Sequence, residues 1–216
     1  PPKELGEVSG QCCPYELMMQ AARTADVVIL NYHHLFDREI RDQIYANLGV
    51  EPQDVLLLID EAHNCGDTIT GIMTVTMEQR DLEQASRELS GMRGRHKGAE
   101  AVRHILPRLT EFIRGLENSH EAEDWFDPAI LDRMVVKESL YKSMDEIVDD
   151  LIGIAESIRE KNQKAGEFRE TAIEGLTQFL LRLSQSATDP AYLTLYRKGD
   201  AGITLEVRNI DPTAAL

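Results

Sequence analysis

A continuous apolar run at residues 55–59 restricts the fold of this chain more than any other feature. It consists of Val55, three leucines and Ile59, and it is the most apolar stretch of the sequence. A strand with one solvated face alternates polar and apolar residues, whereas a strand buried on both faces of a parallel sheet does not. The run therefore predicts an interior strand of an α/β sheet.

The residues before this run supply more of the same pattern. Pro14 suits a first helical position, and the good helix formers that follow predict a helix to Ala22. A β-branched run predicts a strand at 27–30, and a second helix is expected at 35–48. Residues 11–66 thus have the helix–strand–helix–strand order of an α/β sheet. Because two strands and two helices cannot cover both faces of a parallel sheet, we expect this segment to be part of a larger domain.

From about residue 70 to residue 210 the pattern becomes mostly helical, so the chain is expected to be helix-dominated overall. Glycine-rich residues 198–202 separate two alternating arms and predict a β-hairpin within 192–208. Trp125 and Phe126 are interpreted as a packing anchor, the alternative being a platform on which bases stack. Asp127 is expected to cap a helix that has Pro128 in its first turn. The other helices are expected at 76–90 with a capping box at Thr76 and Gln79, 99–116 with a kink or a break at Pro107, 144–158 with a continuation toward Gly166, and 168–186.

Composition limits the classes of function without selecting one. The net charge of −15 argues against a surface that attracts nucleic acid everywhere, although it permits a local basic groove. No apolar run approaches the roughly 18 residues of a membrane span. Three cysteines and no secretory signal favour a reducing cytoplasm, and we expect a prokaryotic one. The chain lacks an initiator Met, as expected of a piece of a longer protein or of a processed N-terminus.

An acidic pair follows the apolar run directly. Asp60 and Glu61 stand where ligands of open α/β sheets bind, beyond the carboxyl end of a strand. In a nucleotide hydrolase the first acid holds Mg²⁺ through water, and the second orients and deprotonates the attacking water. The alternative interpretation is a solvated acidic turn. The spacing with His63 does not match a zinc motif.

Three segments together resemble a known family. Cys13-Pro14-Tyr15 is followed by the stretch from Val28 to Asp37, which contains Asn31-Tyr32-His33-His34, and then by Leu57-Leu58-Ile59-Asp60-Glu61-Ala62-His63-Asn64. In order and separation these segments resemble the XPD-type superfamily 2 DNA helicases, including DinG-like relatives. Residues 209–216 also resemble the point where that family's chain returns to its first motor domain.

The resemblance implies a division of the chain and a role for each matching residue. Residues 1–13 would be the remnant of an iron–sulfur segment, 14–69 part of motor domain 1, 70–210 an Arch-like insertion and 211–216 the return to the motor. Asp60 would hold the Mg²⁺ of Mg-ATP, Glu61 would activate water and His63 would couple nucleotide state to DNA. Cys13 would be the last of four ligands of a [4Fe–4S] cluster, with the other three outside this sequence.

The family also implies what the chain lacks. No Gly-x-x-x-x-Gly-Lys-Ser/Thr loop is present to bind phosphates. We therefore expect this piece alone neither to hydrolyse ATP nor to hold a cluster, whereas its parent would move 5′ to 3′ on single-stranded DNA in DNA repair.

A locally basic stretch is the candidate DNA surface of the insertion. Arg93, Arg95 and Lys97 are its centre, and the alternative interpretation is that these are solvated charges of helix faces and loops. It also includes His96, Arg103, His104, Arg108 and Arg114. Tyr32 and His33 are further candidates for DNA contact, the alternative being a packed Tyr32 and a hydrogen-bonded His33. The rival for the whole chain is a non-enzymatic helical module that binds protein partners through the insertion.

Overall fold

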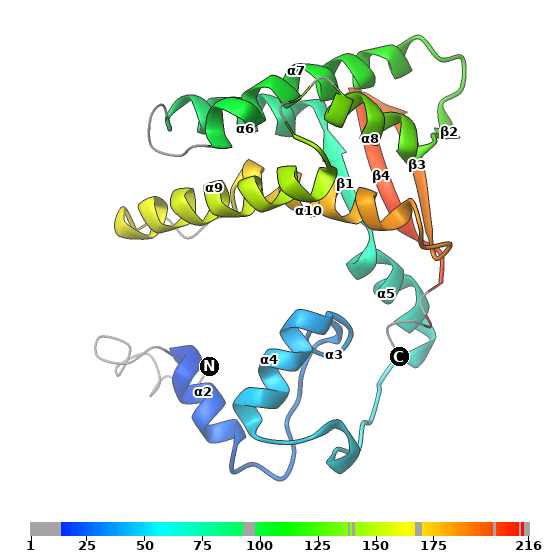
Figure 1. Ribbon diagram of the computed structural model, residues 1–216. Coiled ribbons are helices and arrows are strands. Elements are labelled where there is room, and N and C mark those ends of the chain that lie inside the picture. The colour runs from blue at the N-terminus through cyan, green and yellow to red at the C-terminus, as the bar shows by residue number, and fades with distance from the viewer. Residues whose placement is uncertain are drawn as a thin grey trace. The chain divides into compact units, whose positions relative to one another are not determined.

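The computed structural model describes residues 14–92, 98–137, 139, 141–166, 170–200, 202–211 and 213 (Figure 1). The chain divides into two compact units, one up to Met73 together with the residues after Asp211, and one from Thr74 to Asp211. Cys13, Arg93, Arg95, His96 and Lys97 lie outside the described residues.

The first unit is built from short helices around a small core. Among its described residues, the buried apolar side chains are Phe36, Ile44 and Ile69, and they come from three different helices. The extended Asp37, whose side chain accepts a hydrogen bond from the Ile40 N–H at 3.1 Å, divides the single helix expected at 35–48 into two. The elements are α2 (Pro14–Ala22), α3 (Tyr32–Phe36), α4 (Arg38–Leu48), η1 (Pro52–Asp54), η2 (Ala62–Asn64) and α5 (Cys65–Met73).

The strands expected at 27–30 and 55–59 are not formed. Neither segment has a regular hydrogen-bonded structure, and Ile29 and Leu58 are 93% and 90% exposed. A strand of a parallel sheet exists only through the strands that pair with it, and the described part of this unit contains none. The prediction that residues 11–66 contain two strands of an α/β sheet was therefore wrong for this chain. Neither apolar run is helical, however.

The described residues of the second unit form one antiparallel sheet of four strands. They are β1 (Val75–Glu78), β2 (Glu123–Trp125), β3 (Tyr192–Gly199) and β4 (Gly202–Asn209), in the order β1-β4-β3-β2. The hairpin expected within 192–208 is confirmed, and it forms the two central strands with Gly199 opposite Gly202. β1 pairs with β4 through Val75 opposite Val207.

In the part of this unit that the structure describes, the sheet is accompanied by α6 (Gln79–Ser90), α7 (Gly98–Glu117), α8 (Pro128–Lys137), α9 (Met144–Lys164) and α10 (Ala172–Ser186). α10 contacts β1, β3 and β4, and it also packs on α6 and α9 (Figure 1). Alternate residues of the strands, such as Tyr196, Leu205 and Val207, join the helices in one buried core, while their neighbours face away. The fold is thus helix-dominated, as expected.

Several local predictions for this unit were wrong. Thr76 does not begin a helix, because it belongs to β1; the capping box is instead formed by Glu78 and Asp81. Pro107 does not break α7, which continues through it; the flanking Ile105, Leu106 and Leu109 are all buried, and tertiary packing offsets the missing hydrogen bond.

The ends of the other predicted elements differ in smaller ways. α10 begins only after Thr171, whose side chain caps it. Phe126 is buried against Phe112 with ring centroids 5.4 Å apart, whereas Trp125 is 67% exposed and does not anchor packing.

Where the structure describes the chain, no helix is both long and apolar enough to cross a membrane.

Candidate functional site

The acidic pair lies in a tight turn between the apolar run and α5. Glu61 has φ 51° and ψ 38°, which is a left-handed conformation. Among the described residues other than glycine, it alone has a positive φ. Two hydrogen bonds close the turn: the Asp60 Oδ1 accepts from the Glu61 N–H at 2.9 Å, and the Glu61 carbonyl accepts from the Asn64 N–H at 2.9 Å. Such a backbone is costly for a residue with a Cβ, so it persists only where the surroundings hold it.

The side chains of this turn are accessible. Asp60 and Glu61 are both exposed, and the His63 Nδ1 lies 3.3 Å from the Glu61 Oε2. The structure therefore brings Glu61 and His63 together and leaves the Asp60 carboxylate open on one side. The expected position at the edge of a sheet is not found, because residues 55–59 form no strand.

Tyr32 connects α3 to the acidic turn. Its hydroxyl donates to the carbonyl oxygen of Asp60 and lies 3.1 Å from the carbonyl oxygen of Glu61. Partial burial, the neighbouring Cys65 thiol and the two carboxylates raise the pKa of Tyr32, so the phenol remains a donor at neutral pH. Sequence reasoning missed this contact, because it joins residues 28 positions apart.

The polar residues beside Tyr32 have different roles. Asn31 and His34 form a reciprocal cap: the Asn31 Oδ1 accepts from the His34 N–H at 3.2 Å, and the His34 Nδ1 accepts from the Asn31 N–H at 3.3 Å. His33 is exposed, and its carbonyl accepts from the Asp37 N–H. His34, which was not singled out as a site residue, is thus the histidine that fixes the start of α3.

Part of the basic stretch serves the helices. The Arg103 Nη2 donates to the carbonyl oxygen of Leu89 at the end of α6 at 2.6 Å, and the same guanidinium contacts Glu100. Arg108 pairs with Glu111 at 3.0 Å. The contacts of these two arginines agree with the alternative interpretation, in which the charges belong to helix surfaces.

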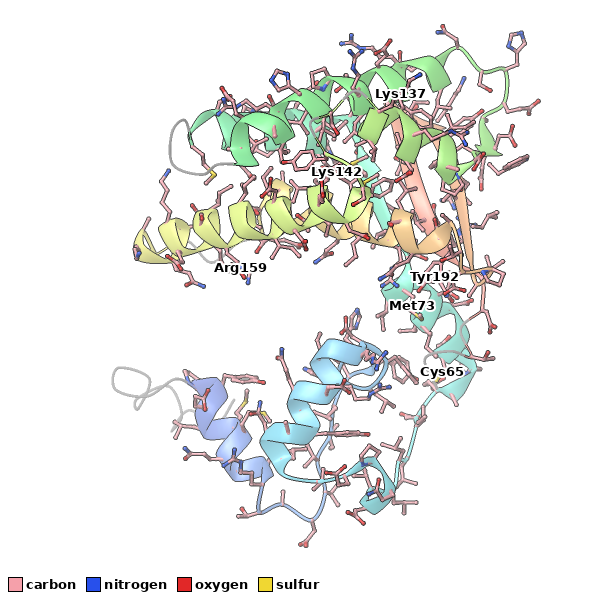
Figure 2. All side chains as sticks on the ribbon, viewed as in Figure 1. Cys65, Met73, Lys137, Lys142, Arg159 and Tyr192 are labelled. Atoms are coloured by element: carbon pink, nitrogen blue, oxygen red, sulfur yellow. The ribbon has the colours of Figure 1, made fainter. Side chains whose placement is uncertain are left out.

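The donor chemistry at the acidic turn fits a magnesium ion. Mg²⁺ takes few protein ligands, prefers oxygen and retains water, so an exposed Asp60 beside Glu61 is a suitable donor set. Across the described ranges, no three His, Cys, Asp or Glu side chains converge as a closed metal site would require. Cys65, the described cysteine, begins α5 and is half-buried (Figure 2).

Comparisons with known proteins agree on one family. Residues 3–82 match the family described as DEAD_2. Over 97% of its length, the chain is 26% identical to the ATP-dependent DNA helicase chl1 of Neosartorya fischeri, of which it covers 26%. It is 22% identical, over 63% of its length, to the general transcription and DNA repair factor IIH helicase subunit XPD of Schizosaccharomyces pombe, of which it covers 18%.

Further relatives extend this agreement. The chain is 33% identical to the human ATP-dependent DNA helicase DDX11 over 48% of its own length and 11% of that protein. A solved structure titled XPD_Helicase has a similar fold, with a TM-score of 0.64 and 20% identity over 94% of this chain and 31% of that one. The chain spans about a quarter or less of the length of the curated relatives it matches.

Proposed function

Because this chain belongs to the XPD-like superfamily 2 helicases, we propose that the protein containing it is an ATP-dependent DNA helicase. Its relatives are named ATP-dependent DNA helicases and a DNA repair helicase subunit, which supports a role in repair. The observation that carries the proposal is the acidic turn, where Asp60 and Glu61 are adjacent and exposed and His63 lies against Glu61. Movement along single-stranded DNA would run 5′ to 3′, as the family resemblance implies.

Each side chain of the turn has a place in phosphoryl transfer. Asp60 would hold the Mg²⁺ of Mg-ATP through water, and the metal supplies neutralisation of phosphate charge when bound. Glu61 would orient the attacking water and accept its proton. His63, 3.3 Å from the Glu61 carboxylate, would relay the state of the nucleotide to the DNA-binding surface.

The remaining roles follow the family resemblance. Residues 14–69 would belong to the first motor domain, 70–210 would form its Arch-like insertion and 211–216 would re-enter the motor. Cys13 would ligate a [4Fe–4S] cluster together with cysteines elsewhere in the protein. Arg93, Arg95 and Lys97, with Tyr32 and His33, would contact single-stranded DNA, and the insertion would also dock protein partners.

Substitution of Glu61 in the full-length protein tests the proposal. Glu61→Gln should abolish Mg-dependent ATP turnover while Mg-ATP still binds, because the amide keeps the shape of the side chain but accepts no proton. Glu51→Gln, an exposed carboxylate before η1, is the matched control and should keep full turnover. Retention of turnover by Glu61→Gln would contradict the assignment. The isolated chain, which lacks a phosphate-binding loop, should be inactive in the same assay.

A further inference from the structure

We infer that Tyr32 is a positioning residue for the acidic turn. Its hydroxyl holds the backbone of Asp60 and Glu61 in the conformation that presents their carboxylates. The hydroxyl donates to the Asp60 carbonyl and lies 3.1 Å from the Glu61 carbonyl. This inference rests on the proposed function, because it assigns Tyr32 a part in ATP hydrolysis.

The turn requires an external restraint. Glu61 has φ 51°, and a left-handed backbone costs an L-residue other than glycine, asparagine or aspartate roughly 1–2 kcal/mol. The local hydrogen bonds at Asp60 Oδ1 and at the Asn64 N–H use atoms of the turn itself. Tyr32 supplies a contact from a separate helix, and its hydroxyl reaches the carbonyls that precede and follow the α-carbon of Glu61.

Tyr32 is itself held firmly. It is the first residue of α3, directly after the Asn31 cap that His34 completes. Its ring lies 5.9 Å from the ring of Phe36, which is only 4% exposed, and α3 packs on α5, the helix that follows the acidic turn. The phenol is therefore anchored to the same small core as the segment it restrains. Loss of its hydroxyl should release the turn without dissolving that core.

The position of Tyr32 also explains why a tyrosine suits this site. Residues 27–30 lead to Tyr32 as residues 55–59 lead to Asp60, so the bond ties the carboxyl ends of two apolar runs together. A water-orienting carboxylate needs its backbone fixed, since a misplacement of about 1 Å can cost roughly a hundredfold in rate. Phenylalanine would keep the ring packing and lose only the donor.

The test is Tyr32→Phe in the full-length protein, with ATP turnover measured at saturating single-stranded DNA. We expect kcat to fall about tenfold and KM for Mg-ATP to change by less than about twofold. Tyr45→Phe, the same change at a half-buried tyrosine of α4, should leave both values unchanged. A kcat within about twofold of the unsubstituted enzyme would overturn the inference.

Two further readouts separate positioning from other roles. If Tyr32 acts only by contacting DNA, Tyr32→Phe will change the DNA concentration for half-maximal turnover and leave kcat at saturation intact, which also overturns the inference. If it acts only in folding, Mg-ATP binding will be lost with activity, with the same consequence. Failure of the proposed function is distinct, because it requires that Glu61→Gln retain turnover.

Discussion

Arg159 of α9 donates a 2.6 Å hydrogen bond from its Nε to the Glu174 Oε1 of α10, and its Nη2 contacts the same oxygen. The other carboxylate oxygen of Glu174 accepts from the Thr171 N–H at 2.8 Å. One buried carboxylate, 8% exposed, therefore both completes the cap of α10 and joins the two helices (Figure 2 labels Arg159).

Substitution of Glu174 by Gln should destabilise the second unit. Burial opposes ionisation of Glu174, but the Thr171 N–H and Arg159 outweigh it and lower its pKa. Losing a charged partner of these hydrogen bonds should cost about 2 kcal/mol of unfolding free energy at pH 7. Urea unfolding of the two chains measures this difference in unfolding free energy. Glu160→Gln, in an exposed pair with Lys164, is the control and should cost less than about 0.5 kcal/mol.

The same carboxylate predicts a pH dependence with a definite sign. Because the pKa of Glu174 is lower in the folded state, its contribution is present above the unfolded pKa and is lost as pH falls through the folded one. The difference in stability between the unsubstituted chain and Glu174→Gln should therefore shrink on acidification. A difference that is constant from pH 7 to the acid limb would contradict this assignment.

Glu206 of β4 predicts the opposite behaviour. It is 6% exposed, and burial raises its pKa despite Arg197 at 3.3 Å, with Glu123 adding to the rise. A raised pKa means that its contribution is present below the unfolded pKa and is lost as pH rises through the folded pKa. In urea unfolding, the Glu206→Gln chain should therefore become less stable relative to the unsubstituted chain as pH falls, while at pH 7 the amide removes the charged partner of both Arg197 and Arg208. If the stability changes caused by Glu206→Gln and by Glu174→Gln vary with pH in the same direction, this interpretation is excluded.

The helices of the second unit were predictable because their apolar residues recur at helical spacing. The buried face of α9, for example, contains Ile147, Leu151, Ile154 and Ile158. β1 and β2 were not predictable, since each is short and exists through pairing with a distant strand: Val75 lies opposite Val207, and Glu123 opposite Arg197. The intrinsic propensity of a short segment does not reveal the distant strand with which it pairs.

The candidate site likewise has a part that could be predicted from the sequence and a part that could not. Adjacent residues of the sequence motif specify the acidic pair and its contact with His63, so both were open to prediction. The restraint on their backbone comes from Tyr32, whose position depends on the packing of α3 against α5. The interior strands expected at 27–30 and 55–59 depend on pairing that these residues do not supply to each other.

Gly98, the first residue of α7, should not accept a side chain. An added Cβ would lie 2.6 Å from both the Cγ and the Oδ2 of Asp150 on α9. Asp150 cannot move away freely, because the Tyr141 hydroxyl donates to it at 2.6 Å. Gly98→Ala should therefore lower the unfolding free energy by about 1–3 kcal/mol, as overpacking does, in urea unfolding.

Gly115 of the same helix provides the matched comparison. An added Cβ there meets nothing within 4 Å, and alanine is a better helix former than glycine. Gly115→Ala should raise stability by up to about 1 kcal/mol. If both substitutions stabilise α7, the close approach of Asp150 to Gly98 is not a feature of the protein in solution.

Residues 74–211 should fold as an isolated piece. The main apolar core lies entirely between Met77 and Val207, with Leu109, Leu151 and Phe179 fully buried, and the four-stranded sheet pairs only strands of this unit. A domain with such a core should unfold cooperatively, with a free energy in the range of about 5–15 kcal/mol. Amide hydrogen exchange should be slowest at Leu109, Leu151 and Leu205, because their amides open only in global unfolding. Residues 14–73, where Ile29 and Leu58 are almost fully exposed, should show no such transition by themselves. If the excised residues 74–211 lack slowly exchanging amides, their core depends on the rest of the protein and the division at Met73 is wrong.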